Sequence, residues 1–145
     1  MTQTTTTTTT LTELTATGIT FDPIHDLTDP VPVLTGPQAQ GDIYVLPTTL
    51  PSVNPRGGDG EPFAFVDVIE GQGIRNPHTL IDLDGRCRWV EGTAGYPFDV
   101  GTLHVPDGTA CFLVHPEHGG NGIGPGSYVI RRQREMAEEI RAVAD

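Results

Sequence analysis

Short apolar runs separated by turn-forming residues dominate the chain from residue 41 onward. The runs at 42–46, 63–69 and 127–133 are rich in β-branched and aromatic residues, which favours strands. Between the first two runs, residues 51–62 carry three prolines and a Gly-Gly-Asp-Gly cluster, so we expect a loop there. Many short strands joined by turn-rich loops predict a mainly β fold, a compact antiparallel sandwich or small barrel.

Two strand pairs stand out in the middle of the chain. The runs at 78–83 and 86–90 flank Asp84-Gly85, a dipeptide typical of two-residue hairpin turns. A second pair, 102–105 and 110–115, is joined by a turn at 106–108. The glycine-rich stretch 119–126 is predicted to be a flexible hairpin loop.

The two ends of the chain have different patterns. At residues 135–143, apolar side chains at i, i+4 and i+7 (Met136, Ile140 and Val143) predict a short C-terminal helix. Residues 1–40 begin with an unbroken threonine run, 4–10, followed by scattered apolar residues and prolines. This pattern predicts an extended N-terminal arm over 1–40, before a β domain over 41–145.

The arm has too little apolar surface to become ordered alone. We therefore expect another chain to hold it, with Leu11, Leu14, Ile19 and Phe21 as anchors. The alternative is an arm that lies on its own domain.

Charge excludes several partners. The net charge is −11 and all eight basic residues are arginine, so we expect no nucleic-acid partner and no anionic membrane partner. The absence of lysine excludes a Schiff base and a P-loop lysine.

The sequence contains no recognisable signal peptide and no apolar stretch long enough to span a bilayer, so we expect a protein that is not secreted. Cys87 and Cys111 lie in apolar runs and are expected to be small buried hydrophobes, with a disulfide or metal role as the alternative.

The C-terminal half has motifs that resemble a known family. His115-Pro-Glu-His118, Pro125-Gly-Ser-Tyr128 and Arg132-Gln-Arg-Glu135, with a closing Val-Ala-Asp, resemble a family of small uncharacterised proteins of actinobacteria and their phages. The resemblance covers about residues 41–145. Where that family has His-x-His, this chain has Asn76-Pro77-His78, and asparagine is a poor zinc ligand.

His78, His115 and His118 are the candidate site residues, because three imidazoles suit zinc or a similar divalent ion. Glu117 or Glu70 would give a two-histidine, one-carboxylate variant. The alternative interpretation is that the histidines lie on solvated turns and that the protein has no cofactor.

No enzyme motif is present. Neither Ser52 nor Ser127 stands in a nucleophile-elbow context, and the glycine-rich stretch lacks the features of a phosphate loop. We therefore expect a protein without catalytic residues.

The cluster Arg131, Arg132 and Arg134 contrasts with the acidic background. It is either a contact to an acidic protein surface or a solvated strand edge whose charges prevent aggregation. Together with the arm, it favours a structural role. We expect a phage virion component, such as a capsid decoration (cement) protein, that binds coat protein or copies of itself in a virion assembled in the host cytoplasm. The alternative is a small metal- or ligand-binding β-barrel, even an enzyme, that uses the three histidines.

Overall fold

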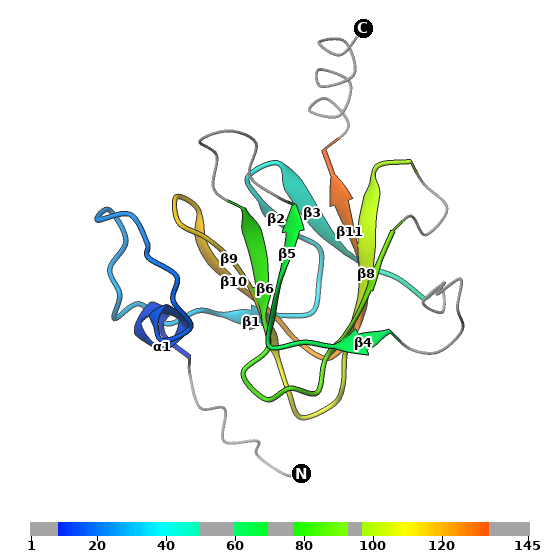
Figure 1. The fold of residues 1–145 in the computed structure, drawn as a ribbon, viewed down its shortest axis with the longest axis horizontal. Coiled ribbons are helices and arrows are strands. Elements are labelled where there is room, and N and C mark those ends of the chain that lie inside the picture. Colours follow the sequence, from blue (N-terminus) through cyan, green and yellow to red (C-terminus); the bar gives the residue numbers. More distant parts are fainter. Residues whose placement is uncertain (1–8, 50–59, 70–76, 93–96, 134–145) are drawn as a thin grey trace, which may run out of the picture.

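A computed structural model describes residues 9–49, 60–69, 77–92 and 97–133. Within them the chain is mainly β, and the predicted sandwich is confirmed (Figure 1). One short helix, α1 (Leu11–Thr15), precedes the strands. The strands are β1 (Val33–Leu34), β2 (Gln38–Gln40), β3 (Ile43–Pro47), β4 (Glu61–Pro62), β5 (Phe65–Ile69), β6 (His78–Ile81), β7 (Arg88–Glu91), β8 (Asp99–Val105), β9 (Cys111–His115), β10 (Gly119–Ile123) and β11 (Gly126–Arg132).

The strands form two sheets that enclose the main core. A five-stranded sheet has the order β1-β10-β9-β6-β5, and a six-stranded sheet has the order β2-β3-β11-β8-β7-β4. Their pairs are antiparallel except β1 with β10. Alternate residues point inward, as the two-residue period of a strand requires. The fully buried side chains between the sheets include Ile43, Leu80, Leu103, Leu113 and Ile130.

The predicted hairpin at Asp84-Gly85 is wrong. β6 and β7 belong to different sheets, so the turn between them carries the chain across the sandwich. A type I′ turn needs positive φ at both central residues, but Gly85 alone has it (φ +70°). The buried Asp82 carboxylate accepts hydrogen bonds from the backbone N–H groups of Asp84 (3.1 Å) and Cys87 (2.7 Å), which stabilises the crossing. The second predicted pair also fails, because β8 and β9 lie in different sheets.

The glycine-rich stretch predicted to be a loop forms strand β10 and the start of β11. Its glycines let other backbone approach closely. A Cβ atom on Gly122 would lie 2.5 Å from the carbonyl oxygen of Pro32, which accepts a hydrogen bond from the Gly122 N–H. A Cβ atom on Gly120 would lie 3.3 Å from Leu11 and 3.4 Å from Leu14. Absent side chains therefore create the surface on which the N-terminal residues lie.

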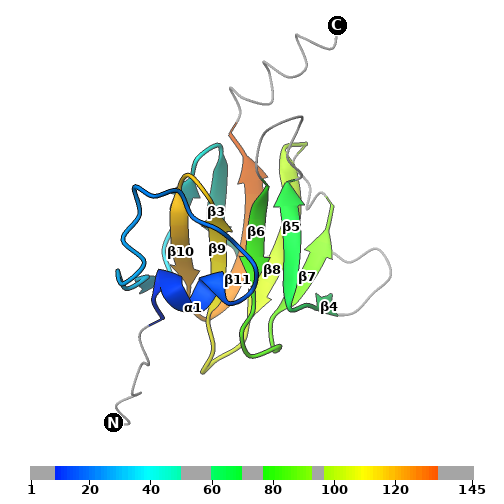
Figure 2. The ribbon, with the colours of Figure 1, turned by 60° about the vertical axis from the view of Figure 1, so that its left-hand side comes forward.

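Residues 9–34, which we call the N-terminal cover, pack on the outer face of the five-stranded sheet and end in its edge strand, β1. Figure 2 shows α1 in front of β9 and β10. A second apolar cluster joins the cover to this sheet, and its members are Leu11, Leu14, Phe21, Val31, Ile81, Phe112 and Val114. Because β9 is covered on both faces, all five of its residues are buried.

The cover corrects the expectation of an extended arm held by another chain. Leu11, Leu14 and Phe21 are buried within their own subunit, and Ile19 packs against the same cluster. The expected boundary at residue 41 falls inside the β2–β3 hairpin, since β1 and β2 already belong to the sheets. The threonine run as far as residue 8, Arg134 and the predicted helix at 135–143 lie outside the described residues.

Two other expectations concern the interior and the membrane. Cys87 and Cys111 are both free and fully buried, and burial raises the pKa of the Cys111 thiol. Across the described part of the chain, no helix has the length and apolar character needed to cross a bilayer.

Packing on β10 gives a first prediction. Gly122→Ala places a methyl group against the backbone of Pro32, so we expect a loss of about 1–3 kcal/mol in the free energy of unfolding. The cover should also detach more often. Chemical denaturation measures the first effect, and amide hydrogen exchange in residues 9–34 measures the second.

Gly36→Ala is the matched control, because a Cβ atom there meets nothing within 4 Å and the backbone conformation does not require glycine. We expect it to change stability by less than about 1 kcal/mol. Equal effects of the two substitutions would contradict the role given to β10.

Candidate functional site

The three histidines singled out in the sequence meet at one end of the sandwich. His78 is the first residue of β6 and His115 is the last of β9. Each shares the inward face of its strand with a core leucine, Leu80 or Leu113, and the two strands are neighbours. The two rings are therefore side by side, with centroids 4.5 Å apart. Both side chains are buried.

His118 comes from the turn that joins β9 to β10. His115 pairs with Gly119, so the turn has three residues, Pro116 to His118, and Gly119 closes it with φ +84°. The His118 ring lies 4.5 Å from His115 and stacks at 6.0 Å on His78, with an interplanar angle of 5°. His78, His115 and His118 thus form one group, which we call the histidine cluster.

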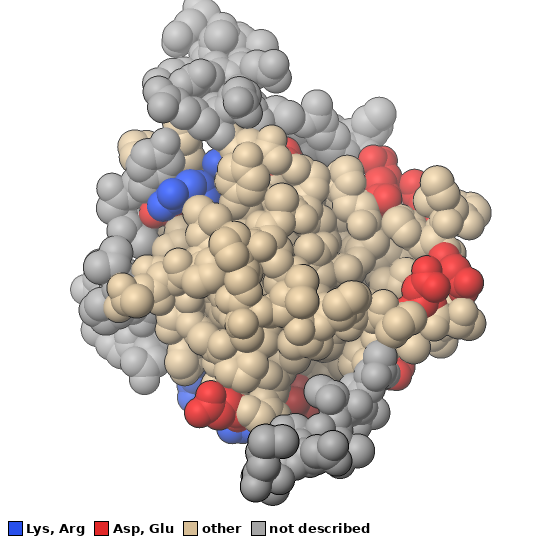
Figure 3. All heavy atoms as spheres, turned by 180° about the vertical axis from the view of Figure 1, so that it is seen from behind, with Lys and Arg blue, Asp and Glu red and all other residues tan. Residues whose placement is uncertain are grey.

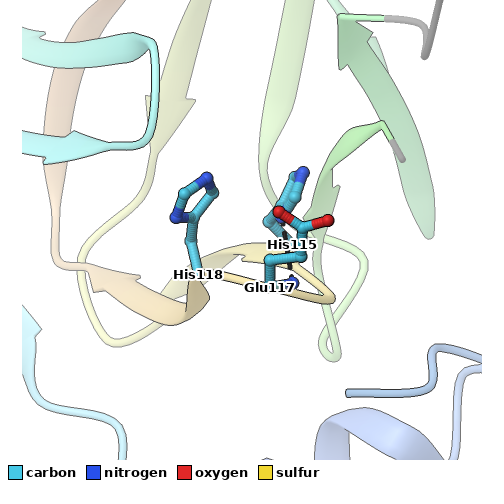
Figure 4. A group of neighbouring side chains, drawn as sticks. All are labelled: His115, Glu117 and His118. Atoms are coloured by element: carbon cyan, nitrogen blue, oxygen red, sulfur yellow. Dashed lines mark hydrogen bonds between the residues drawn. The ribbon is translucent and has the colours of Figure 1, made fainter. Parts of the chain in front are cut away.

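Glu117 adds a carboxylate to the cluster. Figure 4 shows the side chains of His115, Glu117 and His118 rising from the same side of the turn. One potential ligand atom from each lies within 4.8 Å of the other two. His115 is buried while Glu117 and His118 are exposed, so the group reaches from the end of the core to solvent. The Glu117 N–H donates a hydrogen bond to His115 Nδ1 (3.1 Å), which places the proton of a neutral His115 ring on Nε2.

The tip of the β2–β3 hairpin holds His78 on both sides. Gln40 Nε2 donates to the Leu113 carbonyl (2.8 Å) and to Asn121 Oδ1 (2.9 Å), so Gln40 Oε1 faces His78. His78 Nδ1 donates to that oxygen (3.0 Å), and its Nε2 lies 2.9 Å from Asp42 Oδ1.

Protonation of His78 is the main electrostatic question at the site. Burial lowers the pKa of His78 below its ordinary value of 6.5, and His115 lowers it further, whereas Asp42 opposes both. A neutral ring that donates from Nδ1 has a lone pair on Nε2. That lone pair then faces a carboxylate oxygen at 2.9 Å, and only a cation or a proton between the two atoms makes this contact favourable.

Gly41 lets the hairpin tip approach the rings. Its φ of +57° suits glycine, and a Cβ atom there would lie 2.7 Å from His118 Nε2 and 3.2 Å from His78 Cε1. The hairpin backbone thus covers one side of the histidine cluster.

The N-terminal cover holds the turn in place from another side. His25 Nε2 donates a hydrogen bond to the Glu117 carbonyl (2.7 Å), and the Asp22 N–H donates to the Pro116 carbonyl (2.9 Å). These bonds fix the segment that carries Glu117 and His118.

The predicted arginine patch lies on β11, and none of its described residues belongs to the histidine cluster. Arg131 forms an ion pair with the buried carboxylate of Asp99 (2.6 Å), and Arg132 is the last residue of the strand. Glu70 and Asn76, two other residues considered for a metal site, fall outside the described ranges.

Sequence reasoning missed Gln40, Asp42 and His25. The expected strand 42–46 includes Asp42, although a glycine followed by aspartate is itself a turn signal. No local pattern signals His25, because only the docking of the cover brings it to the turn.

A family model described as a domain of unknown function (DUF8820) matches residues 39–133. The match runs from β2 to the end of β11 and includes the histidine cluster, Glu117 and Asp42. It leaves out residues 9–38, which contain the N-terminal cover. No curated protein and no solved structure matches the chain.

The lowered pKa of His78 predicts a pH dependence. Between the folded and the ordinary pKa the unfolded chain binds more protons, so the stability of metal-free protein should fall as pH drops below 6.5. Denaturant unfolding with a chelator at pH 7.5 and 5.5 measures this. His78→Gln should reduce the difference between the two values, and an unchanged difference would contradict this assignment.

Proposed function

This chain belongs to the DUF8820 family, and we propose that it binds a divalent transition-metal ion at the histidine cluster. The observation that carries the proposal is the meeting of His115, Glu117 and His118 within 4.8 Å, beside a fourth potential ligand, His78. Zinc is the first candidate, because imidazole and carboxylate are among its usual ligands.

Protonation supports the proposal. Metal ligands must be deprotonated, and a lowered pKa keeps His78 neutral at pH 7. The pair formed by His78 Nε2 and Asp42 Oδ1 presents two acceptors at 2.9 Å. Two ligands at about 2.0–2.1 Å from one tetrahedral ion would be about 3.3–3.4 Å apart, so these two atoms would separate slightly to hold the ion between them. The pair is thus suited to binding the ion itself or to holding a proton next to it.

The main cost of metal binding is small. His115 Nδ1 now accepts the Glu117 N–H, and binding through this nitrogen would break that bond. A hydrogen bond of this kind contributes about 1 kcal/mol, whereas a structural zinc site contributes about 10–16 kcal/mol. The free energy lost with this hydrogen bond is therefore small compared with the free energy of metal binding.

Access and charge also favour a cation. Glu117 and His118 are exposed, so an ion can enter from solvent without unfolding the chain. The net charge of −11 attracts divalent cations. We propose a binding role without catalysis, since four protein ligands would fill a four-coordinate ion and leave no open position for water.

The test is a metal titration of purified chain stripped with a chelator. We expect one zinc ion per chain, and a stabilisation of about 2.7 kcal/mol at a free zinc concentration one hundred times the dissociation constant. Calorimetry gives the stoichiometry, and thermal unfolding gives the stabilisation. Metal-free protein whose unfolding temperature does not respond to zinc, cobalt, manganese or iron would overturn the proposal.

Two histidine variants separate specific from general effects. His118→Ala removes an exposed ligand and should weaken binding at least about tenfold without unfolding the protein. His104→Ala is the matched control, because His104 is exposed on β8 and contacts Ser127 rather than the cluster. Cobalt substitution provides a second readout, since its visible bands report the ligand set.

A role as a phage virion component, such as a capsid decoration protein, is a second proposal. This second proposal also assumes that the chain is related to proteins of actinobacteria and their phages. The feature that favours it is β1, an edge strand with exposed Val33 and Leu34. Burial of Leu11 and Leu14 within the subunit weakens it. Co-purification with virions in a fixed ratio to coat protein would support this role.

A further inference from the structure

A groove of about 550 Å³ lies on the edge formed by β2, β3 and β11, on the far side of the β2–β3 hairpin from the core residues of β3. Tyr44 and Leu46 form part of its wall and alternate along β3 with the core residues Ile43 and Val45. The groove therefore opens on the outer face of the six-stranded sheet. Its volume falls in the range of small-molecule sites.

The groove combines an apolar surface with positive charge. Pro37, Ala39, Tyr44 and Leu46 supply the apolar wall, and Arg131 and Arg132 supply the charge. No acidic residue is among the described residues that line it. In a chain of net charge −11, this local excess of positive charge is unusual. On the face shown in Figure 3, basic groups lie only at the margin, while the centre carries neither sign of charge.

The two arginines have different surroundings. Arg131 Nε donates to Asp99 Oδ1 (2.6 Å), and the Asp99 side chain is only 1% exposed, so a buried carboxylate holds Arg131 in place. Arg132 is held through its backbone, since its N–H donates to the Phe98 carbonyl. The Arg132 side chain is half-buried and adds a positive charge that the Arg131–Asp99 pair does not neutralise.

We propose that this groove binds a small amphipathic anion: an apolar chain or ring that bears one carboxylate or phosphate group. The apolar part would lie along Tyr44 and Leu46, and the anionic group would bind Arg132, whose planar guanidinium matches both anions. A peptide strand fits less well, because β2 at the edge has only three residues with which to pair.

Binding of decanoate, decyl phosphate and neutral decanol tests the proposal on the full chain. We expect saturable one-to-one binding of at least one anion in calorimetry, and at least about tenfold weaker binding of decanol. The ratio between decanoate and decyl phosphate identifies the preferred anion. Amide resonances of Tyr44 and Leu46 should shift on binding. The absence of saturable anion binding, or shifts confined to other strands, would overturn the proposal.

Charge-removal variants complete the test. Arg132→Gln should weaken anion binding about tenfold and leave decanol unaffected. Arg88→Gln, at an exposed arginine on β7, is the matched control and should change neither. Equal losses in both variants would show attraction by general charge and overturn the site. His118→Ala should bind the anion normally, so this proposal and the metal proposal fail independently.

Discussion

The contact between the N-terminal cover and the bare backbone of β10 is the interaction on which the rest of the structure depends. Gly120 and Gly122 have no side chains, so α1 packs directly on the strand and β1 pairs with it at the edge of the sheet. This contact buries Ile81, Phe112 and Val114 on the outer face of the five-stranded sheet. The result is three layers rather than two, with β9 in the middle and no exposed face. A conventional strand with side chains at these positions would keep the cover away and leave an apolar face in water.

The same contact determines the shape of the histidine cluster. The cover brings His25 and Asp22 to the β9–β10 turn, where both donate to its backbone carbonyls. The β2–β3 hairpin approaches from the other side and holds His78 between Gln40 and Asp42. The cluster therefore has a rigid surround made from three segments distant in sequence. In the proposed metal site, such a surround would orient the ligands before the ion arrives.

The sequence predicts the fold class and some of the strands, because apolar runs such as 42–46 and 127–133, which overlap β3 and β11, carry their signal locally. It fails where position depends on a distant contact. Asp84-Gly85 satisfies a hairpin rule, yet the Asp82 carboxylate directs the chain across to the other sheet. The glycine-rich stretch has the composition of a loop, and the sequence does not show that Pro32 and Leu11 lie against it. The three histidines meet because two of them lie at adjoining ends of neighbouring strands, whereas Gln40, Asp42 and His25 depend on tertiary docking.

The pairing of β3 with β11 has a consequence for synthesis on the ribosome. Ile43 pairs with Arg132, and Val33 pairs with Gly122, so strands near the start of the chain find their neighbours only near its end. The five-stranded sheet cannot close until β10 has left the exit tunnel, and the six-stranded sheet cannot close until β11 has done so. Contacts of such long sequence separation also slow the search for the native pairing. During translation the apolar residues of the first half, Leu11 and Phe21 among them, must stay exposed, and at that stage a nascent-chain chaperone would have most to bind.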